Sequence, residues 1–223
     1  MDPNKGKGLL KIQRNSEEPP LAGYGSASPL LQAGRISCQR FRGRLFARVY
    51  DPQVMKGPLH RFFDADHRRL DDLLERATSH PDRVDLALFG EFRAGLLKHI
   101  GMEEKVLFLA ASRARGDRLP RFAKLRVDHG AIASLLVPTP TPALVAEIRS
   151  ILGPHNRREE EEGGIYDVCD EAIGPVEAER LLEGLRHFPE VRLKGHNDAP
   201  VVHEHIRVNV ELSRAQWRED PER

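Results

Sequence analysis

From Met55 onward, apolar residues recur every three or four positions, which is the spacing of one face of an α-helix. Short segments rich in Pro, Gly and Ser divide this part of the chain into four long stretches. The pattern predicts helices over about residues 58–77, 83–113, 120–136 and 142–173. Within the fourth stretch, the Gly153-Pro154 pair predicts a kink or a short break just before His155, and Gly163 and Gly164 form a second weak point.

Each predicted helix carries one stripe of inward-facing positions. The four stripes are Phe63, His67, Leu70, Leu74 and Ala77; Phe92, Leu96, His99, Glu103, Val106 and Ala110; Phe122, Leu125, His129, Ile132 and Leu136; and Leu144, Ile148, Ile151, His155, Glu159, Glu162, Tyr166 and Cys169. Amphipathic helices joined by links of a few residues pack as antiparallel neighbours. The predicted fold class is therefore all-α, an up-down-up-down four-helix bundle over residues 55–174.

The sequence after the bundle is less regular. Residues 175–187 are typical of a short extra helix, and the alternation of apolar and polar residues over 201–212 favours a strand or an ordered arm. We therefore expect residues 175–223 to form a C-terminal helix followed by an irregular arm.

Residues 1–54 differ in kind from the rest, because they are rich in Gly and Pro and show no helical or strand period. We expect a disordered or loosely ordered extension. It is basic: residues 1–57 carry 10 Lys and Arg against 4 Asp and Glu, whereas residues 58–223 carry 25 against 30. The basic stretch 35–48 is interpreted as a solvated tail, with docking on an acidic partner or on the acidic bundle as the alternative. Few aromatic residues and no binding motif accompany this charge, so no nucleic-acid partner is expected.

The composition excludes several classes of protein. The longest apolar run, residues 106–111, is far shorter than a membrane-spanning helix requires, and no signal peptide is recognisable. We expect a cytoplasmic protein without membrane contact. Cys38 and Cys169 are the only cysteines, which excludes a disulfide framework and a cysteine-based metal site. Any metal must therefore be held by His and carboxylate side chains.

Six polar residues interrupt the apolar stripes, where a polar group without a partner is costly. They are His67, His99, Glu103, His129, His155 and Glu159. Glu103 and Glu159 each follow a His by four residues, which places both side chains of a pair on one face, one turn apart. A single inward His is more often structural than a ligand, but all six residues share the phase of their stripes. Two such pairs facing each other predict a dinuclear metal site, whose imidazole and carboxylate ligands suit iron, manganese or zinc.

Four segments carry these residues: DHRRLDDLL (66–74), HIGMEEKVLF (99–108), DHGAIASLL (128–136) and HNRREEEE (155–162). Together they resemble the hemerythrin-like HHE cation-binding domain over about residues 58–173. The resemblance implies two non-haem iron ions, with manganese or zinc as alternatives, and two carboxylates that bridge them. The implied metal ligands are His67, His99, Glu103, His129, His155 and Glu159.

The chain departs from the oxygen-carrying hemerythrins at two positions. Where those proteins have a second His on the third helix, this chain has Ala133, which implies an open coordination position. The carriers also place the fourth-helix carboxylate five residues after the His, which here is Glu160. The phase of the helix favours Glu159, with Glu160 and Glu162 as alternatives. His60 lies about 10 Å along the helix from His67 and is expected at the rim.

These observations favour a non-haem di-iron protein that binds or senses oxygen, nitric oxide, peroxide or iron in stress handling, rather than a bulk oxygen carrier. The expected partner is a diatomic ligand or peroxide. No general acid or base is evident beyond the ligands, so no catalytic residue is assigned. One alternative is a di-metal redox enzyme that consumes peroxide or nitric oxide. Another is a metal-free helical interaction domain with an incidental surface cluster of His187, His196, His203 and His205.

Overall fold

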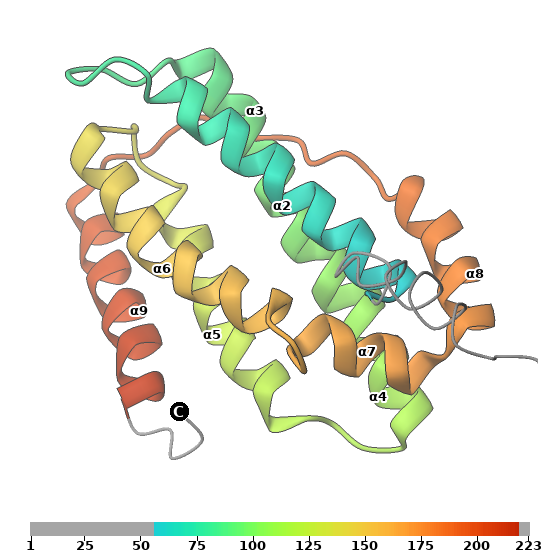
Figure 1. Cartoon of the computed structure of the whole chain (residues 1–223). Coiled ribbons are helices and arrows are strands. Elements are labelled where there is room, and N and C mark those ends of the chain that lie inside the picture. Colours follow the sequence, from blue (N-terminus) through green and yellow to red (C-terminus); the bar gives the residue numbers. More distant parts are fainter. Residues whose placement is uncertain (1–55, 219–223) are drawn as a thin grey trace, which may run out of the picture. The chain divides into compact units, whose positions relative to one another are not determined.

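The computed structural model describes residues 56–218, and all regular secondary structure in this range is helical (Figure 1). The helices are α2 (Pro58–Ala77), α3 (Leu86–Met102), the π-helix η1 (Glu103–Leu107), α4 (Phe108–Arg115), α5 (Pro120–Leu135), α6 (Pro142–Glu160), α7 (Ile165–Ile173), α8 (Pro175–Arg186) and α9 (Pro200–Arg218). The predicted all-α class is confirmed. The extension expected over residues 1–54 lies outside the described residues.

Helix α2 begins and ends where the sequence predicts. Pro58 occupies the first turn, where a missing backbone N–H removes no helical hydrogen bond. The backbone N–H groups of Leu59 and His60 donate to the carboxylate of Asp170 in α7, at 3.1 and 2.8 Å. A Cβ atom at Gly57 would lie 2.1 Å from Asp170 Cγ, so this close approach of α7 to the start of α2 requires glycine.

The second predicted helix is continuous from α3 to α4 but contains the π-helical turn η1. A π turn inserts one extra residue and so shifts the inward face by one position. Leu107, Phe108 and Ala111 are accordingly buried, whereas the predicted Val106 and Ala110 are only partly buried. The predicted stripe is wrong beyond Glu103, which is the first residue of the π turn.

The fourth predicted stretch divides into α6 and α7, and the division lies after His155 rather than just before it. Helix α6 continues through Gly153 and Pro154, although an interior proline removes one hydrogen bond and crowds the preceding turn, so the expected break at this place is absent. The chain breaks instead at residues 161–164, where Gly163 adopts a left-handed backbone conformation with φ of 71°. Glu162, predicted to face inward, is exposed in this break.

The expected helix after the bundle is present as α8, but the expected strand or arm over 201–212 is wrong. Residues Pro200–Arg218 form α9, which packs along α5. Its buried residues are Ile206, Val210 and Ser213, which is the spacing of one helical face. Val201, Val208 and Leu212 are exposed apolar residues, and they produced the alternation that suggested a strand.

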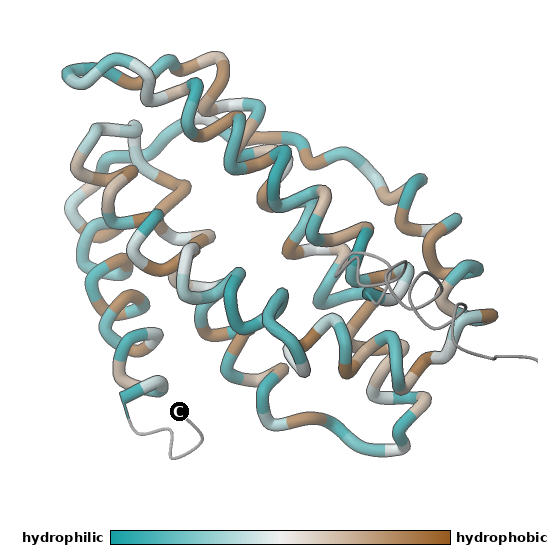
Figure 2. Tube along the Cα trace, in the orientation of Figure 1, coloured by the Kyte–Doolittle hydropathy of each residue, from teal (hydrophilic) through white to brown (hydrophobic). Residues whose placement is uncertain are grey.

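The buried apolar residues form two clusters, one around Leu70, Leu96 and Ile132 and the other around Phe63, Phe108 and Leu125. In Figure 2 the apolar residues lie mainly on the sides of the helices that face one another. Along α2 the chain passes from Phe63 in one cluster to Leu70 in the other, and His67 lies between them. Among the helices of residues 56–218, none is both long and apolar enough to cross a membrane.

Candidate metal centre

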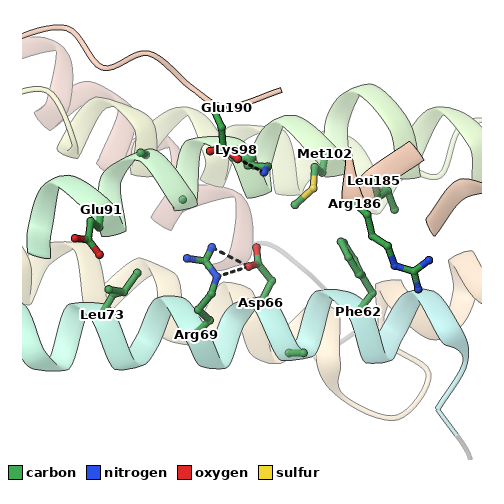
Figure 3. A pocket seen from close by; sticks show the side chains of 13 residues that line it. Phe62, Asp66, Arg69, Leu73, Glu91, Lys98, Met102, Leu185, Arg186 and Glu190 are labelled. Carbon is green, nitrogen blue, oxygen red and sulfur yellow. Dashed lines mark hydrogen bonds and ion pairs between the residues drawn. The ribbon is translucent and has the colours of Figure 1, made fainter. Parts of the chain in front are cut away.

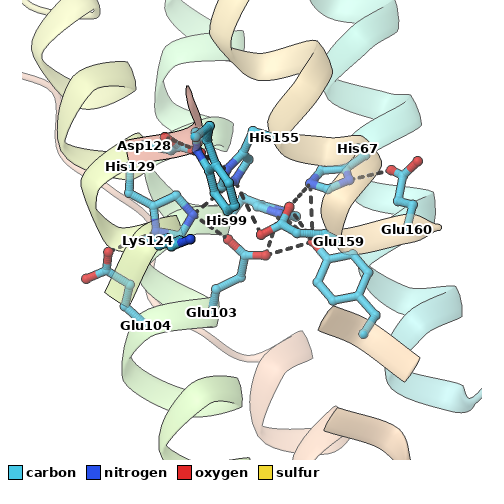
Figure 4. Close-up of polar contacts among 12 residues, drawn as sticks. His67, His99, Glu103, Glu104, Lys124, Asp128, His129, His155, Glu159 and Glu160 are labelled. Atoms are coloured by element: carbon cyan, nitrogen blue, oxygen red, sulfur yellow. Dashed lines mark hydrogen bonds and ion pairs between the residues drawn. The ribbon is translucent and has the colours of Figure 1, made fainter. Parts of the chain in front are cut away.

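The six polar residues predicted on the inward stripes meet at one place in the structure (Figure 4). They come from α2, α3, η1, α5 and α6, and their exposed fractions lie between 0% and 3%. They are His67, His99, Glu103, His129, His155 and Glu159. Burial of this many ionisable groups requires that they satisfy one another or share a cation.

The donor atoms form two groups that could each hold a metal ion. One contains His67, His99 and Glu103, and the other contains Glu103, His129, His155 and Glu159; within each group, one donor atom per residue lies within 4.8 Å of all others. Glu103 Oε1 lies 3.4 Å from His99 Nε2, and its Oε2 lies 3.2 Å from His129 Nε2. Glu159 lies 3.6 Å from His67 Nε2 through Oε2 and 3.3 Å from His155 Nε2 through Oε1. Two carboxylates therefore stand between two pairs of imidazoles.

Each imidazole also contacts an outer carboxylate through its Nδ1 atom. These outer contacts link α2 to α3, η1 to α5, α5 to α6 and α6 back to α2, in a closed ring. They are Asp66 with His99 at 2.9 Å, Glu104 with His129 at 2.9 Å, Asp128 with His155 at 3.4 Å, and Glu160 with His67 at 2.5 Å. A carboxylate on the outer nitrogen fixes the tautomer of a metal-binding His and directs Nε2 at the metal.

Sequence reasoning assigned no role to Asp66, Glu104 and Asp128, although a signal was present. Every one of the four outer acids is the immediate sequence neighbour of a predicted ligand, in the dipeptides 66–67, 103–104, 128–129 and 159–160. Adjacent helical residues point about 100° apart, so an acid beside an inward ligand points along the bundle surface toward the next helix.

The arrangement of lone pairs fits a bound metal. With Nδ1 donating outward, a neutral imidazole presents the lone pair of its Nε2 to the centre. The buried oxygens Glu103 Oε2 and Glu159 Oε1 accept no hydrogen bond, and His129 Nε2 faces His155 Nε2 at 3.2 Å. Acceptors that face one another in a dry interior repel unless a cation lies between them. The imidazole and carboxylate donors are those that iron, manganese and zinc accept.

Without a metal, the centre carries uneven charge. Burial lowers the pKa of His155 to about 4 and also lowers the pKa of His67. Burial opposes the charge on His99 too, but Glu103 and Asp66 outweigh it and raise the pKa of His99 to about 9. Burial and the neighbouring Glu103 raise the pKa of Glu159 well above its usual value. A divalent cation would replace the protons that the metal-free centre must hold.

Tyr166 of α7 closes one side of the centre. Its hydroxyl donates to Glu103 Oε1 at 2.7 Å and lies 3.3 Å from Glu159 Oε2. The side chain is fully buried, and its ring stacks on Phe63 with 5.2 Å between the centroids. Sequence analysis predicted that Tyr166 faces inward, and this is confirmed, but it assigned the residue no role.

The remaining candidate residues lie outside the two donor groups. Glu160 contacts His67 from the outer side, and Glu162 is exposed. His60 is only 1% exposed, so the prediction that it lies at the rim is wrong: α7 covers the start of α2, and Asp167 contacts His60 Nδ1 at 2.5 Å. The histidines suggested as a surface cluster are all exposed and belong to neither group; they are His187, His196, His203 and His205.

Helix α9 contributes to the centre through Asp128, the outer carboxylate of His155. Ser213, Gln216 and Trp217 donate to this carboxylate at 2.6, 2.8 and 2.9 Å. Burial alone would raise the pKa of Asp128, but the hydrogen bonds from His155, Ser213 and Trp217 hold it below its usual value. The C-terminal helix thus keeps Asp128 ionised behind His155.

A groove of about 700 Å³ between α2 and α3 reaches the outer side of the centre (Figure 3). Asp66 lines it and contacts His99 on its inner side. Arg69 pairs with Asp66 at 2.8 Å, and Lys98 pairs with Glu190 across the groove at 2.5 Å. The lining includes this outer carboxylate but none of the six inward donors.

Comparison with known protein families supports a cation-binding domain in this part of the chain. Residues 59–162 match the family described as Hemerythrin HHE cation binding domain. This segment runs from the first turn of α2 to just beyond the end of α6, and it contains all six inward polar residues. Neither the comparison with curated proteins nor that with solved structures gave a match.

Proposed function

We propose that this chain, whose residues 59–162 match the family described as Hemerythrin HHE cation binding domain, holds a dinuclear non-haem iron centre and uses it to bind or sense a small ligand. The proposed ligand classes are oxygen, nitric oxide and peroxide, with a role in stress handling or iron sensing. In this proposal α2, α3 with η1, α5 and α6 form the up-down-up-down bundle, and the metal ligands are His67, His99, Glu103, His129, His155 and Glu159.

The observation that carries the proposal is the position of the two buried carboxylates between two pairs of imidazoles. It supports one ion held by His67 and His99, a second ion held by His129 and His155, and Glu103 and Glu159 as bridges between them. Bridging carboxylates with imidazoles and no thiolate favour iron or manganese pairs over a single zinc ion.

A bound metal pair supplies an open coordination position for a small ligand and, where the metal is redox-active, electrons. The protein contributes the surroundings. The outer carboxylates hold the imidazoles in one orientation, and the two apolar clusters exclude bulk water from the centre. Ala133, one turn after His129, offers no ligand atom, which supports an open position at the ion held by His129 and His155.

Azide, a small anionic ligand, tests the proposed function. Iron-loaded, oxidised protein is expected to be yellow to brown, and azide should change its near-ultraviolet and visible charge-transfer bands with saturation. Zinc-loaded protein is the matched control, because it has the same centre without these bands. A di-ferric protein whose spectrum does not respond to azide would contradict the proposal.

Peroxide and nitric oxide distinguish ligand binding from catalysis. We expect binding of about one equivalent per centre, whereas consumption of many equivalents would identify a di-metal redox enzyme. The buried oxygens without a hydrogen-bond donor and the facing imidazole nitrogens at the centre argue against a metal-free interaction domain.

A further inference from the structure

Tyr166 has no part in the ligand set proposed above, yet its oxygen lies among four of the donor atoms. It is 2.7 Å from Glu103 Oε1 and 3.3 Å from Glu159 Oε2. It is also 3.3 Å from His67 Nε2 and 3.4 Å from His99 Nε2. All four atoms belong to the side of the centre where His67 and His99 meet the two carboxylates.

These separations are those between neighbouring ligands of one metal ion. Nitrogen and oxygen ligands lie about 2.0–2.2 Å from a first-row divalent metal, so adjacent ligands in four- to six-coordinate geometry lie about 2.8–3.6 Å apart. Three of the four contacts of the Tyr166 oxygen, at 3.3 to 3.4 Å, fall in this range, and the fourth, the 2.7 Å hydrogen bond to Glu103, lies just below it. The distances between His99 and Glu103, 3.4 Å, and between His67 and Glu159, 3.6 Å, also fall in this range.

A hydrogen bond alone does not account for the position of this oxygen. A phenol has one proton, and the shortest contact indicates that Glu103 receives it. Toward His67 the phenol oxygen then presents a lone pair to an Nε2 atom that is itself an acceptor in the neutral ring, because Nδ1 of that ring contacts Glu160. A cation between these two atoms converts this unfavourable contact into coordination.

The surrounding structure fixes the ring in this position. The break at residues 161–164 ends α6 and lets α7 return over the centre, with Ile165, Tyr166 and Cys169 buried against the neighbouring helices. Phe63 stacks on one face of the ring at 5.2 Å, and the edge contact with His60 has 5.7 Å between the ring centroids. A rigid, buried phenol aimed at donor atoms is preorganised for coordination.

Among residues 56–218, the other half of the centre has no residue equivalent to Tyr166. Around His129 and His155, the group of donors found within the described residues is completed only by Glu103 and Glu159. The ring stacked beside His129 is Phe108, which has no donor atom. The two metal positions are therefore unequal, with five protein donors on one side and four on the other.

We propose that Tyr166 is a direct ligand of the ion held by His67 and His99, and that this leaves the ion held by His129 and His155 as the binding position for a small ligand. On coordination the phenol oxygen exchanges its bond to hydrogen for a bond to the metal, and the proton is released to solvent. This inference rests on the proposed function, since it requires a metal at the centre.

Iron-loaded, oxidised protein tests the inference without activity as a readout. A phenolate bound to ferric iron gives a charge-transfer band in the visible, and resonance Raman excitation within that band enhances tyrosine ring vibrations. We expect both signals in the wild-type protein, with the vibrations shifted by ring-deuterated tyrosine. We expect both to be absent in Tyr166→Phe at unchanged iron content. Cys169→Ala, on the same helix and outside the centre, is the packing control and should keep both.

The outcomes separate the inference from the proposed function. A wild-type protein that binds iron but shows no tyrosine vibrations would overturn the inference alone, and so would a Tyr166→Phe variant that keeps the visible band. A wild-type protein that binds no metal would overturn the proposed function. Where the Tyr166→Phe variant folds poorly, the labelled wild-type spectrum shows whether a tyrosine binds the iron, and the double variant Tyr24→Phe, Tyr50→Phe, which keeps Tyr166 as its one tyrosine, should retain the signal.

Discussion

The four imidazoles of the centre each contact a carboxylate from a neighbouring helix, and each of those carboxylates adjoins a proposed ligand in sequence. Asp66 beside His67 orients His99, and Asp128 beside His129 orients His155. A rotation of any one helix would therefore disturb one inward ligand and one outer contact at the same time. Each pair of adjacent residues thus positions one inward side chain and one imidazole on the next helix.

Replacing either bridging carboxylate should reduce metal binding. Glu103→Ala or Glu159→Ala removes donors from both metal positions, and we expect metal content to fall by at least half. Glu161→Ala is the matched control, because Glu161 lies in the same acidic run but is exposed in the break after α6. Metal analysis of the three variants checks this, and equal content in all three would show that the carboxylates are not ligands.

The pKa of His99 predicts a pH dependence for the metal-free protein. Despite burial, Glu103 and Asp66 raise the pKa of His99 from 6.5 to about 9 in the folded state. Its protonation thus stabilises the metal-free fold fully below pH 6.5, and this stabilisation is lost as pH rises to about 9. Metal competes with the same proton, so binding strengthens over that range.

The gap between the melting temperatures of metal-loaded and metal-free protein should therefore widen by several degrees from pH 7 to pH 9. Thermal melts of both forms at matched ionic strength measure it. A constant gap would mean that metal binding displaces no proton from His99 in this range.

Helix α9 was expected as a strand or arm, yet it completes the support of the centre. Its buried face supplies the hydroxyl, amide and indole donors that hold Asp128. The matched family segment ends at residue 162, so this support comes from outside it. The sequence of α9 did not reveal the role, because a donor on a helix becomes informative only when its acceptor, 85 residues away for Ser213, is known.

Trp217→Phe should lower both the stability of the fold and the metal affinity of the centre, although Trp217 itself is not a proposed ligand. The change removes the indole N–H that contacts both oxygens of Asp128 and keeps an aromatic ring. We expect a loss of about 1 kcal/mol in the free energy of unfolding. We also expect a several-fold loss of metal affinity, smaller than the roughly 10–100-fold typical when an orienting partner is removed entirely.

Metal titration and thermal melts of the Trp217→Phe variant check these two losses. Arg207→Ala on the exposed face of α9 is the control, since Arg207 pairs with Glu204 on the same helix and does not contact Asp128 within the described residues. Equal losses in both variants would assign the effect to the helix as a whole rather than to Asp128.

Across the whole molecule, burial explains what the sequence could predict. A helix that packs against the apolar clusters buries residues at regular spacing along one face. The spacing of apolar residues therefore predicted the stripes through His67, His129 and His155, and it predicted the limits of α2. The π turn at Glu103 and the break at Gly163 did not follow, because each interrupts the regular helical phase from which the stripes were predicted. The outer acids depended on the order of the helices around the centre, which a local pattern does not contain.

We propose that six inward side chains hold two metal ions. Metal analysis of the full chain, purified without an affinity tag and quantified per chain by mass spectrometry, measures this without any substitution. We expect two iron ions per chain, and removal of the iron should lower the melting temperature. A protein with no metal, or with a single zinc ion and the same stability after its removal, would contradict it.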